Sequence, residues 1–432
     1  MTRRGRAIIL CTAAAACLTF VILKASSGRD DDSAGAPKER KEAVLNEYLT
    51  NALSDSIGTE AIDRRVASFM GEWQVKGASL AVMRHDSLLY AKGYGWADEA
   101  EGKRMEPYNL LRLASVSKLV TAIGIMKLKE QGKLSLSDHV FGEGGILSGM
   151  EYASAIRDRN YYKITVEDLL RHRGGFTLAG GDPMFSTITV MARNGLSTPP
   201  DNDKLIECTL KRSLSYMPGT SQAYSNFGYL LLSKVIETLS GESYEDYIQK
   251  NVLKPAGCLD FHIAGNYYKD KYPSEVRYYV PVNEMPVEEY SNSGRMVTRC
   301  YGGNDIHNLS GAGSCVASVP EIMKLVASVD GKPEIPDILS AESVGEMVRY
   351  VDNVTFSLGW NDTNPESGWT RSGSFSGTSA MVKYFPDGEC WIMVTNTSTW
   401  KGAGFSKKMA VLFSELRQKY GSTLPRRDLF HI

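Results

Sequence analysis

A serine and a lysine three residues apart, Ser115 and Lys118, are the pair whose types and spacing most directly predict chemistry. Positions i and i+3 of a helix share one face, so the lysine amine can reach the serine hydroxyl. A partly desolvated lysine beside a serine can remove the hydroxyl proton and turn the serine into a good nucleophile. The positive end of the helix dipole favours the negative charge that develops. The pair therefore predicts covalent catalysis through Ser115.

The residues after this pair predict the helix that would hold it. Val116, Leu119, Val120 and Ile123 recur with the helical period, and Gly132 ends the pattern. An unpaired lysine at the start of a buried helix is costly. We therefore expect the lysine to have partners inside the fold.

A serine–lysine hydrolase also needs a second acid/base group, and we expect it at Tyr224 in the stretch Tyr-Ser-Asn. A phenol near cations can shuttle a proton between nucleophile and leaving group. Asn226, two positions on, offers a donor and an acceptor for a substrate amide. A second Tyr-Ser-Asn begins at Tyr290, in a polar stretch without periodicity. We favour Tyr224 because it lies between a Pro-Gly turn and a strongly periodic helix.

The third candidate element is the stretch Arg371, Ser372, Gly373 and Ser374, just before a C-terminal hairpin. A glycine on a strand lets a substrate backbone approach closely. The N–H of Ser374 could then join that of Ser115 as an oxyanion hole. The guanidinium of Arg371 could bind a substrate carboxylate.

The elements that must position these residues come from both ends of the chain. Hairpins are predicted at 78–93 and 380–396, with helices at 61–73 and 405–420. A further helix around 226–240 and shorter helical stretches fill the middle. We expect an α/β (α+β) fold: one antiparallel sheet made from both chain ends, end helices on one face and a mainly helical region on the other. The serine would lie where that region meets the sheet.

Composition limits the function classes. A formal charge of −1 gives no overall attraction to nucleic acid. The six histidines do not cluster, and the cysteines show no zinc spacing. No Walker loop, H-E-x-x-H or G-x-S-x-G motif is present. We expect no metal, no cofactor and no nucleic-acid partner.

The N-terminus predicts export. Arg3, Arg4 and Arg6 precede an uncharged run at 7–23, the pattern of a signal peptide or a membrane anchor. Cys17 follows a run of four alanines, so processing as a lipoprotein is a second interpretation. We expect a signal or anchor at 1–24, a linker at 25–57, a catalytic domain at 58–421 and a tail at 422–432, located in the periplasm or cell envelope. We expect a monomer.

Taken together, the motifs resemble the serine β-lactamase and penicillin-binding protein-like superfamily, in the branch related to class C β-lactamases. The resemblance covers roughly 60–420 and rests on the stretches 113–118, 164–172, 218–226, 311–314 and 384–388. It implies a β-lactamase/transpeptidase-like fold with Ser115 as the acylated nucleophile. It also implies acid/base work by Lys118 and Tyr224, substrate contact by Asn226, and oxyanion binding by the N–H groups of Ser115 and Ser374.

Two stretches depart from the family pattern. Arg371 stands where the family has lysine or histidine, which favours carboxylate binding over proton transfer because arginine does not give up its proton near neutral pH. The stretch 172–175 is a loop variant, in which we interpret His172 as structural.

This resemblance implies a serine hydrolase acting on peptide, amide or β-lactam-like substrates, such as a D-Ala-D-Ala carboxypeptidase, a D-peptidase or a β-lactamase. Two alternatives stay open. One is a carboxylesterase on the same fold. The other is a non-hydrolytic receptor for penicillin or cell-wall peptide.

Overall fold

The computed structural model describes residues 48–431 except 57 and 180, and these lie in one compact unit. The predicted signal or anchor and most of the predicted linker lie outside the described residues. Within the described part of the chain, no helix is long and apolar enough to cross a bilayer.

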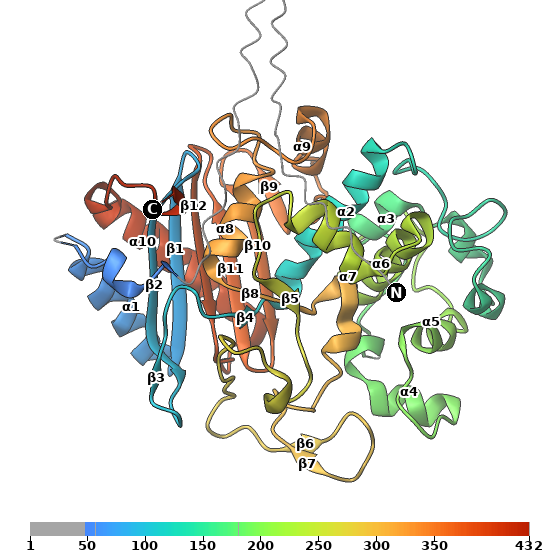
Figure 1. The fold of residues 1–432 in the computed structure, drawn as a ribbon. Coiled ribbons are helices and arrows are strands. Elements are labelled where there is room, and N and C mark those ends of the chain that lie inside the picture. The colour runs from blue at the N-terminus through green and yellow to red at the C-terminus, as the bar shows by residue number, and fades with distance from the viewer. Residues whose placement is uncertain (1–47, 57, 180, 432) are drawn as a thin grey trace, which may run out of the picture. The chain divides into compact units, whose positions relative to one another are not determined.

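The centre of this unit is a seven-stranded antiparallel sheet in the order β3-β2-β1-β12-β11-β10-β9 (Figure 1). Strands from the two ends of the chain meet in its middle, where Ala78 of β1 pairs with Thr395 of β12. The strands are β1 (Gly77–Arg84), β2 (Ser87–Asp98), β3 (Lys103–Arg104), β9 (Asp362–Asn364), β10 (Gly368–Phe375), β11 (Thr378–Tyr384) and β12 (Glu389–Thr395). The predicted joining of both chain ends is confirmed.

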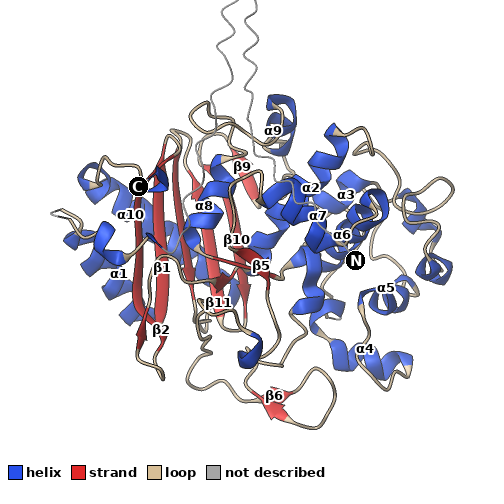
Figure 2. Cartoon of the chain, viewed as in Figure 1, coloured by secondary structure: helices blue, strands red, loops and turns tan. Residues whose placement is uncertain are grey.

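The two faces of the sheet are covered by different helices (Figure 2). On one face, α1 (Glu60–Trp73) and α10 (Phe405–Tyr420) bury Phe69 and Phe413 in a core that includes Trp391 of β12. On the other face, α8 (Val319–Ala327) packs against β1 and β12. Its side chains join the larger core, which continues into the helical region.

That helical region holds α2 (Ser117–Glu130), which lies between the sheet and the other helices (Figure 1). Nearly every residue of α2 is buried, on all sides rather than on one face. It packs against α6 (Asn226–Ser240). The remaining helices are α3 (Val166–Leu170), α4 (Thr187–Asn194), α5 (Asn202–Leu210), α7 (Tyr244–Ile248) and α9 (Ala341–Met347).

Two smaller sheets complete the unit. The first has the order β4-β8-β5, and the second pairs β6 with β7. Their strands are β4 (Leu111–Arg112), β5 (Phe261–Ile263), β6 (Val287–Glu288), β7 (Met296–Val297) and β8 (Cys315–Ala317). The first of these sheets leads the chain directly into Ser115.

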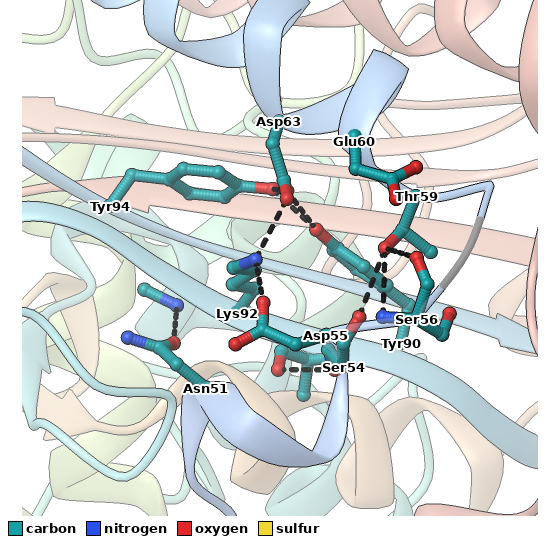
Figure 3. Close-up of polar contacts among 12 residues, drawn as sticks. Asn51, Ser54, Asp55, Ser56, Thr59, Glu60, Asp63, Tyr90, Lys92 and Tyr94 are labelled. Atoms are coloured by element: carbon teal, nitrogen blue, oxygen red, sulfur yellow. Dashed lines mark hydrogen bonds and ion pairs between the residues drawn. The ribbon is translucent and has the colours of Figure 1, made fainter.

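The compact unit extends beyond the predicted domain bounds of 58 and 421. Asn51 accepts a hydrogen bond from the N–H of Gly93, and Ser54 donates to the carbonyl of Ala91, so the end of the predicted linker is fixed to β2 (Figure 3). Asp63 of α1 also accepts hydrogen bonds from Tyr90, Lys92 and Tyr94 of β2.

The predicted tail at 422–432 also belongs to this unit. Leu429 and Phe430 are buried in the core, and Asp428 accepts a hydrogen bond from the N–H of Leu88. Leu429 and Phe430 are buried because β2 offers an apolar surface beside them.

Candidate active site

Ser115 lies in a 3₁₀ turn, Ala114–Val116, between β4 and α2. The turn is anchored on β8, because the N–H of Leu113 donates to the carbonyl of Cys315 at 2.9 Å. Ala114 has a φ of 48°, a region that side-chain-bearing residues seldom occupy. Ser115 is half-buried, so its hydroxyl sits on a strained, well-anchored turn at the edge of the core.

Lys118 is fully buried, and its Nζ has three acceptors. It donates to Ser115 Oγ at 3.2 Å, to Asn226 Oδ1 at 2.6 Å and to the carbonyl of Ala312 at 2.5 Å. Burial lowers the pKa of Lys118 to about 8, with a further lowering by the Arg371 charge. Three acceptors match the three N–H bonds of an ammonium.

Tyr224 reaches the same serine, its hydroxyl donating to Ser115 Oγ at 2.5 Å. Burial alone would raise the pKa of this phenol, but the charges of Lys118 and Arg371 outweigh burial and lower it. Its ring also lies 4.9 Å from the Lys118 ammonium. The structure therefore brings together Ser115 and Lys118, which the helical spacing predicts, and Tyr224, which the Tyr-Ser-Asn stretch suggested.

The other Tyr-Ser-Asn is not part of this cluster. The Tyr290 hydroxyl accepts a hydrogen bond from Asn266, and its ring packs near Tyr267.

His172 is buried against Tyr224, with ring centroids 4.5 Å apart. Its Nδ1 accepts the N–H of Ser225 at 3.1 Å, which assigns the proton to Nε2. Burial, together with the Lys118 and Arg371 charges, holds the pKa of His172 well below its usual value. A neutral imidazole that supports the Tyr224 loop agrees with the structural role predicted for it.

Arg371 does not present a free guanidinium to a substrate, in contrast to the prediction. It is fully buried, and its Nε and Nη2 donate to the carbonyl oxygen of Ser115 at 2.7 and 2.5 Å. The arginine side chain points inward from β10 and reaches the turn under the nucleophile. Two of its nitrogens are therefore engaged before any substrate arrives.

The rest of the stretch lies on β10, beside the nucleophile. A Cβ added to Gly373 would stand 2.3 Å from the carbonyl oxygen of Leu113 and 2.9 Å from the nitrogen of Ser115, so only glycine permits this approach. Ser374 follows directly and is half-buried. The N–H of Ser372 is bound to Asn361 Oδ1 at 2.7 Å. Oxyanion binding by the N–H groups of Ser115 and Ser374 stays a prediction.

One residue of the site escaped the sequence reasoning. Asp182 precedes the 3₁₀ turn Pro183–Phe185, and its Oδ2 accepts a hydrogen bond from Asn226 Nδ2 at 2.6 Å. The Asp-Pro pair signals a helix cap. No local sequence pattern predicts the contact between Asp182 and Asn226, because the two residues are 44 positions apart in the chain.

The arrangement suits acyl transfer by a serine. One hydroxyl is in hydrogen-bond contact with two groups whose pKa values are lowered toward neutrality, of which Lys118 is fully buried and Tyr224 half-buried. In the described ranges, no group of three or more histidine, cysteine, aspartate or glutamate side chains could hold a metal ion.

Comparison with known proteins gives one family over most of the chain. The family model described as Beta-lactamase matches residues 62–414. Penicillin-binding protein 4* of Bacillus subtilis is 26% identical over 333 residues, which cover 75% of this chain and 68% of that protein.

Solved structures share the fold. D-amino acid amidase from Ochrobactrum anthropi SV3, complexed with D-phenylalanine, has a TM-score of 0.64 at 18% identity and covers 84% of this chain and 99% of its own. EstCE1, a hydrolase with promiscuous acyltransferase activity, has a TM-score of 0.61 at 18% identity over 83% of this chain and 99% of its own.

Proposed function

The chain belongs to the Beta-lactamase family of serine hydrolases, and from this premise we propose that it cleaves amide bonds through an acyl-enzyme on Ser115. The observation that carries the proposal is the double hydrogen bond on Ser115 Oγ, from Lys118 at 3.2 Å and from Tyr224 at 2.5 Å. A nucleophile in contact with both a cation and a phenol can lose its proton without water.

The Lys118–Tyr224 pair has two titratable protons, one on the ammonium and one on the phenol. We propose that one of them is already absent when the first half-reaction begins. Lys118 keeps its ammonium, which its three acceptors favour, and Tyr224 is the phenolate. In this protonation state the 2.5 Å hydrogen bond between the two oxygens is donated by the Ser115 hydroxyl to Tyr224. Tyr224 takes the Ser115 proton while Oγ bonds to the substrate carbonyl carbon. The C–N bond then breaks, and the departing amine leaves with the proton from Tyr224.

The second half-reaction releases the acyl group. Water attacks the ester carbon and gives its proton to Tyr224, the bond to Ser115 Oγ breaks, and the serine recovers that proton. In both halves the carbonyl oxygen carries negative charge in the transition state. We assign its stabilisation to the N–H groups of Ser115 and Ser374.

The substrates we propose are peptides, amides or β-lactam-like compounds. This choice is supported by the similarity to penicillin-binding protein 4* and by the fold shared with D-amino acid amidase. A carboxylesterase and a non-hydrolytic receptor are the alternatives that an experiment must separate.

The test follows adducts on the intact protein over time. The wild type and Ser115→Ala are incubated with a fluorescent penicillin and separately with a fluorophosphonate. A penicilloyl adduct that forms and decays supports an amide or β-lactam hydrolase. A stable adduct identifies the receptor, and labelling by fluorophosphonate alone favours the esterase. Adducts of equal yield on Ser115→Ala contradict the proposal.

We also propose that the enzyme works outside the cytoplasm. The support is the positive N-terminus followed by the uncharged run at 7–23, in residues outside the described part of the chain. Cell fractionation tests this, and a full-length cytoplasmic protein would contradict it.

A further inference from the structure

Tyr224 lies in a segment without regular secondary structure, just before α6, and this segment is held by one residue. The N–H of Ala223 donates to the carbonyl oxygen of His172 at 3.0 Å. The N–H of Ser225 donates to Nδ1 of the His172 ring at 3.1 Å. His172 therefore binds the backbone amides on both sides of Tyr224, one through its own backbone and one through its side chain.

The imidazole of His172 also packs against the phenol ring. The two ring centroids are 4.5 Å apart, and the ring planes are tilted by 36°. Phe356 packs near both rings, with centroids 4.6 Å from His172 and 5.9 Å from Tyr224. Because His172 is fully buried and Tyr224 only half-buried, the histidine is the fixed partner of the two. The contact of the phenol with Ser115 Oγ thus depends on His172.

The backbone of His172 has an unusual conformation that makes this double contact possible. Its φ of 56° lies in the left-handed region, which residues with side chains seldom occupy. Its N–H donates to the carbonyl of Leu169 at 3.2 Å, and its carbonyl also accepts the Tyr216 hydroxyl at 3.3 Å. Strained conformations that the surroundings maintain are common at functional sites. Here the conformation directs both the carbonyl and the ring of one residue at the segment 223–225.

His172 does not extend a proton path from Tyr224. Its Nδ1 accepts from Ser225, so the ring proton is on Nε2, and that atom has no hydrogen-bond partner among the residues that the structure describes. A second proton on Nδ1 would face the N–H of Ser225 with another donor. Lys118 and Arg371 add positive charge that disfavours the imidazolium further. The imidazole is therefore suited to hold Tyr224 in place and not to exchange protons with it.

We propose that His172 is the positioning residue of Tyr224, which it fixes against Ser115 by binding both flanking amides and packing against the phenol ring. The assignment rests on the proposed acyl transfer through Ser115. It goes beyond a contribution to stability, because the loss of His172 should slow the reaction only as far as the Tyr224 hydroxyl takes part in it. Displacing a reacting group by about an ångström can cost about 100-fold in rate.

The experiment measures the rate constant with which a fluorophosphonate labels Ser115 in the full chain. His172→Ala should lower this rate constant about 10- to 100-fold. His172→Asn should recover most of that loss, because its Oδ1 can accept from Ser225 in place of Nδ1 and asparagine tolerates a positive φ. His262→Asn is the matched control and should label at the wild-type rate, because His262 also stacks on a tyrosine, 4.4 Å from Tyr272, but outside the site.

A double-variant cycle separates positioning from a general effect on the fold. In a Tyr224→Phe background, His172→Ala should cost a smaller factor than in the wild type, because no phenol hydroxyl is left to position. Thermal melts show which variants are folded. If His172→Ala does not fold, His172→Leu takes its place in the cycle, since leucine fills the space of the ring without offering an acceptor.

Three outcomes overturn the proposal. The first is an equal factor lost with and without the Tyr224 hydroxyl, which would make His172 a residue of the fold alone. The second is a folded His172→Ala or His172→Leu that labels at the wild-type rate. The third is a folded His172→Asn that is as slow as the variant without an acceptor. Absence of any Ser115 adduct in the wild type would instead overturn the proposed function itself.

Discussion

The guanidinium of Arg371 holds the backbone of Ser115, with Nε and Nη2 donating to the same carbonyl oxygen at 2.7 and 2.5 Å. Arg371 was expected to bind the substrate. It instead stabilises the backbone turn that carries the nucleophile. It also adds a positive charge beside Lys118 and Tyr224, where it lowers the pKa of both groups.

Replacing Arg371 should therefore slow acylation for every substrate. We expect Arg371→Ala to lower kcat/KM about 10- to 100-fold on carboxylate-bearing peptides and on neutral esters alike, because a nucleophile displaced by an ångström loses that much. Arg371→Lys should recover part of the rate. Steady-state kinetics on both substrate types measure this effect. A loss of kcat/KM confined to carboxylate-bearing substrates would mean that Arg371 binds the substrate carboxylate after all.

Lys118 and Tyr224 should behave as one acid/base unit. Lys118→Ala and Tyr224→Phe should each slow acylation about 10²- to 10⁴-fold, the usual contribution of a positioned acid/base group. The double variant should lose less than the product of the two, because each group depends on the other. Tyr290→Phe is the control. Equal damage from Tyr290→Phe would mean that the other Tyr-Ser-Asn is catalytic.

The rate should rise with pH as the pair loses its first proton. Burial lowers the pKa of Lys118 to about 8, and neighbouring cations lower that of Tyr224, so the coupled pair should titrate in a single step near neutral to mildly alkaline pH. Arg371→Ala removes a positive charge, so the Lys118–Tyr224 pair should hold its protons more tightly. The rising part of the pH–rate profile should therefore move to higher pH. A pH–kcat/KM profile that is flat from 6 to 9 would contradict this assignment.

A buried carboxyl far from the site should make stability depend on pH. Asp86 lies in the β1–β2 turn, its Oδ2 accepts the N–H of Ile335, and burial together with the charge of Asp330 raises its pKa to about 8. The folded protein then holds a proton that the unfolded chain releases near pH 4. Stability contributed by this group is complete below pH 4 and falls until pH 8.

The substitution Asp86→Asn should abolish this fall in stability between pH 4 and pH 8. Its φ of 58° suits asparagine, and the amide oxygen can still accept from Ile335. We expect a gain of about 1–3 kcal/mol at pH 8, the cost of a buried unsatisfied group, and little gain at pH 4. Thermal melts at both pH values measure it, and a gain that is independent of pH would exclude Asp86 as the titrating group.

Much of the fold follows from local signals in the sequence. Phe405–Tyr420 begins and ends where the helical period and flanking residues predict. The turn at His85 and Asp86 has positive φ at both residues, as a tight hairpin requires. By contrast, the bounds of α4 and α5 were not predicted, because helices of eight and nine residues are too short to give a clear period.

Local sequence patterns predicted only those contacts of the site whose residues are close together in the chain. Ser115 and Lys118 share one turn, so their contact follows from helical geometry. Asp182 and the direction of Arg371 depend on contacts across 44 and 256 positions, which no local pattern encodes. The resemblance to known enzymes suggested which segments meet but not how this arginine is oriented.

The identity of the nucleophile is the central claim, and peptide mapping of the acylated protein tests it most directly. Trypsin cleaves after Arg112 and Lys118, which isolates the hexapeptide 113–118 with two serines, Ser115 and Ser117. Ser117 is buried, and its hydroxyl is bound to the carbonyl of Ala114. Fragmentation of the penicilloyl- or phosphonyl-labelled peptide should place the adduct on Ser115. An adduct on Ser117, or on any peptide outside 113–118, would contradict the account.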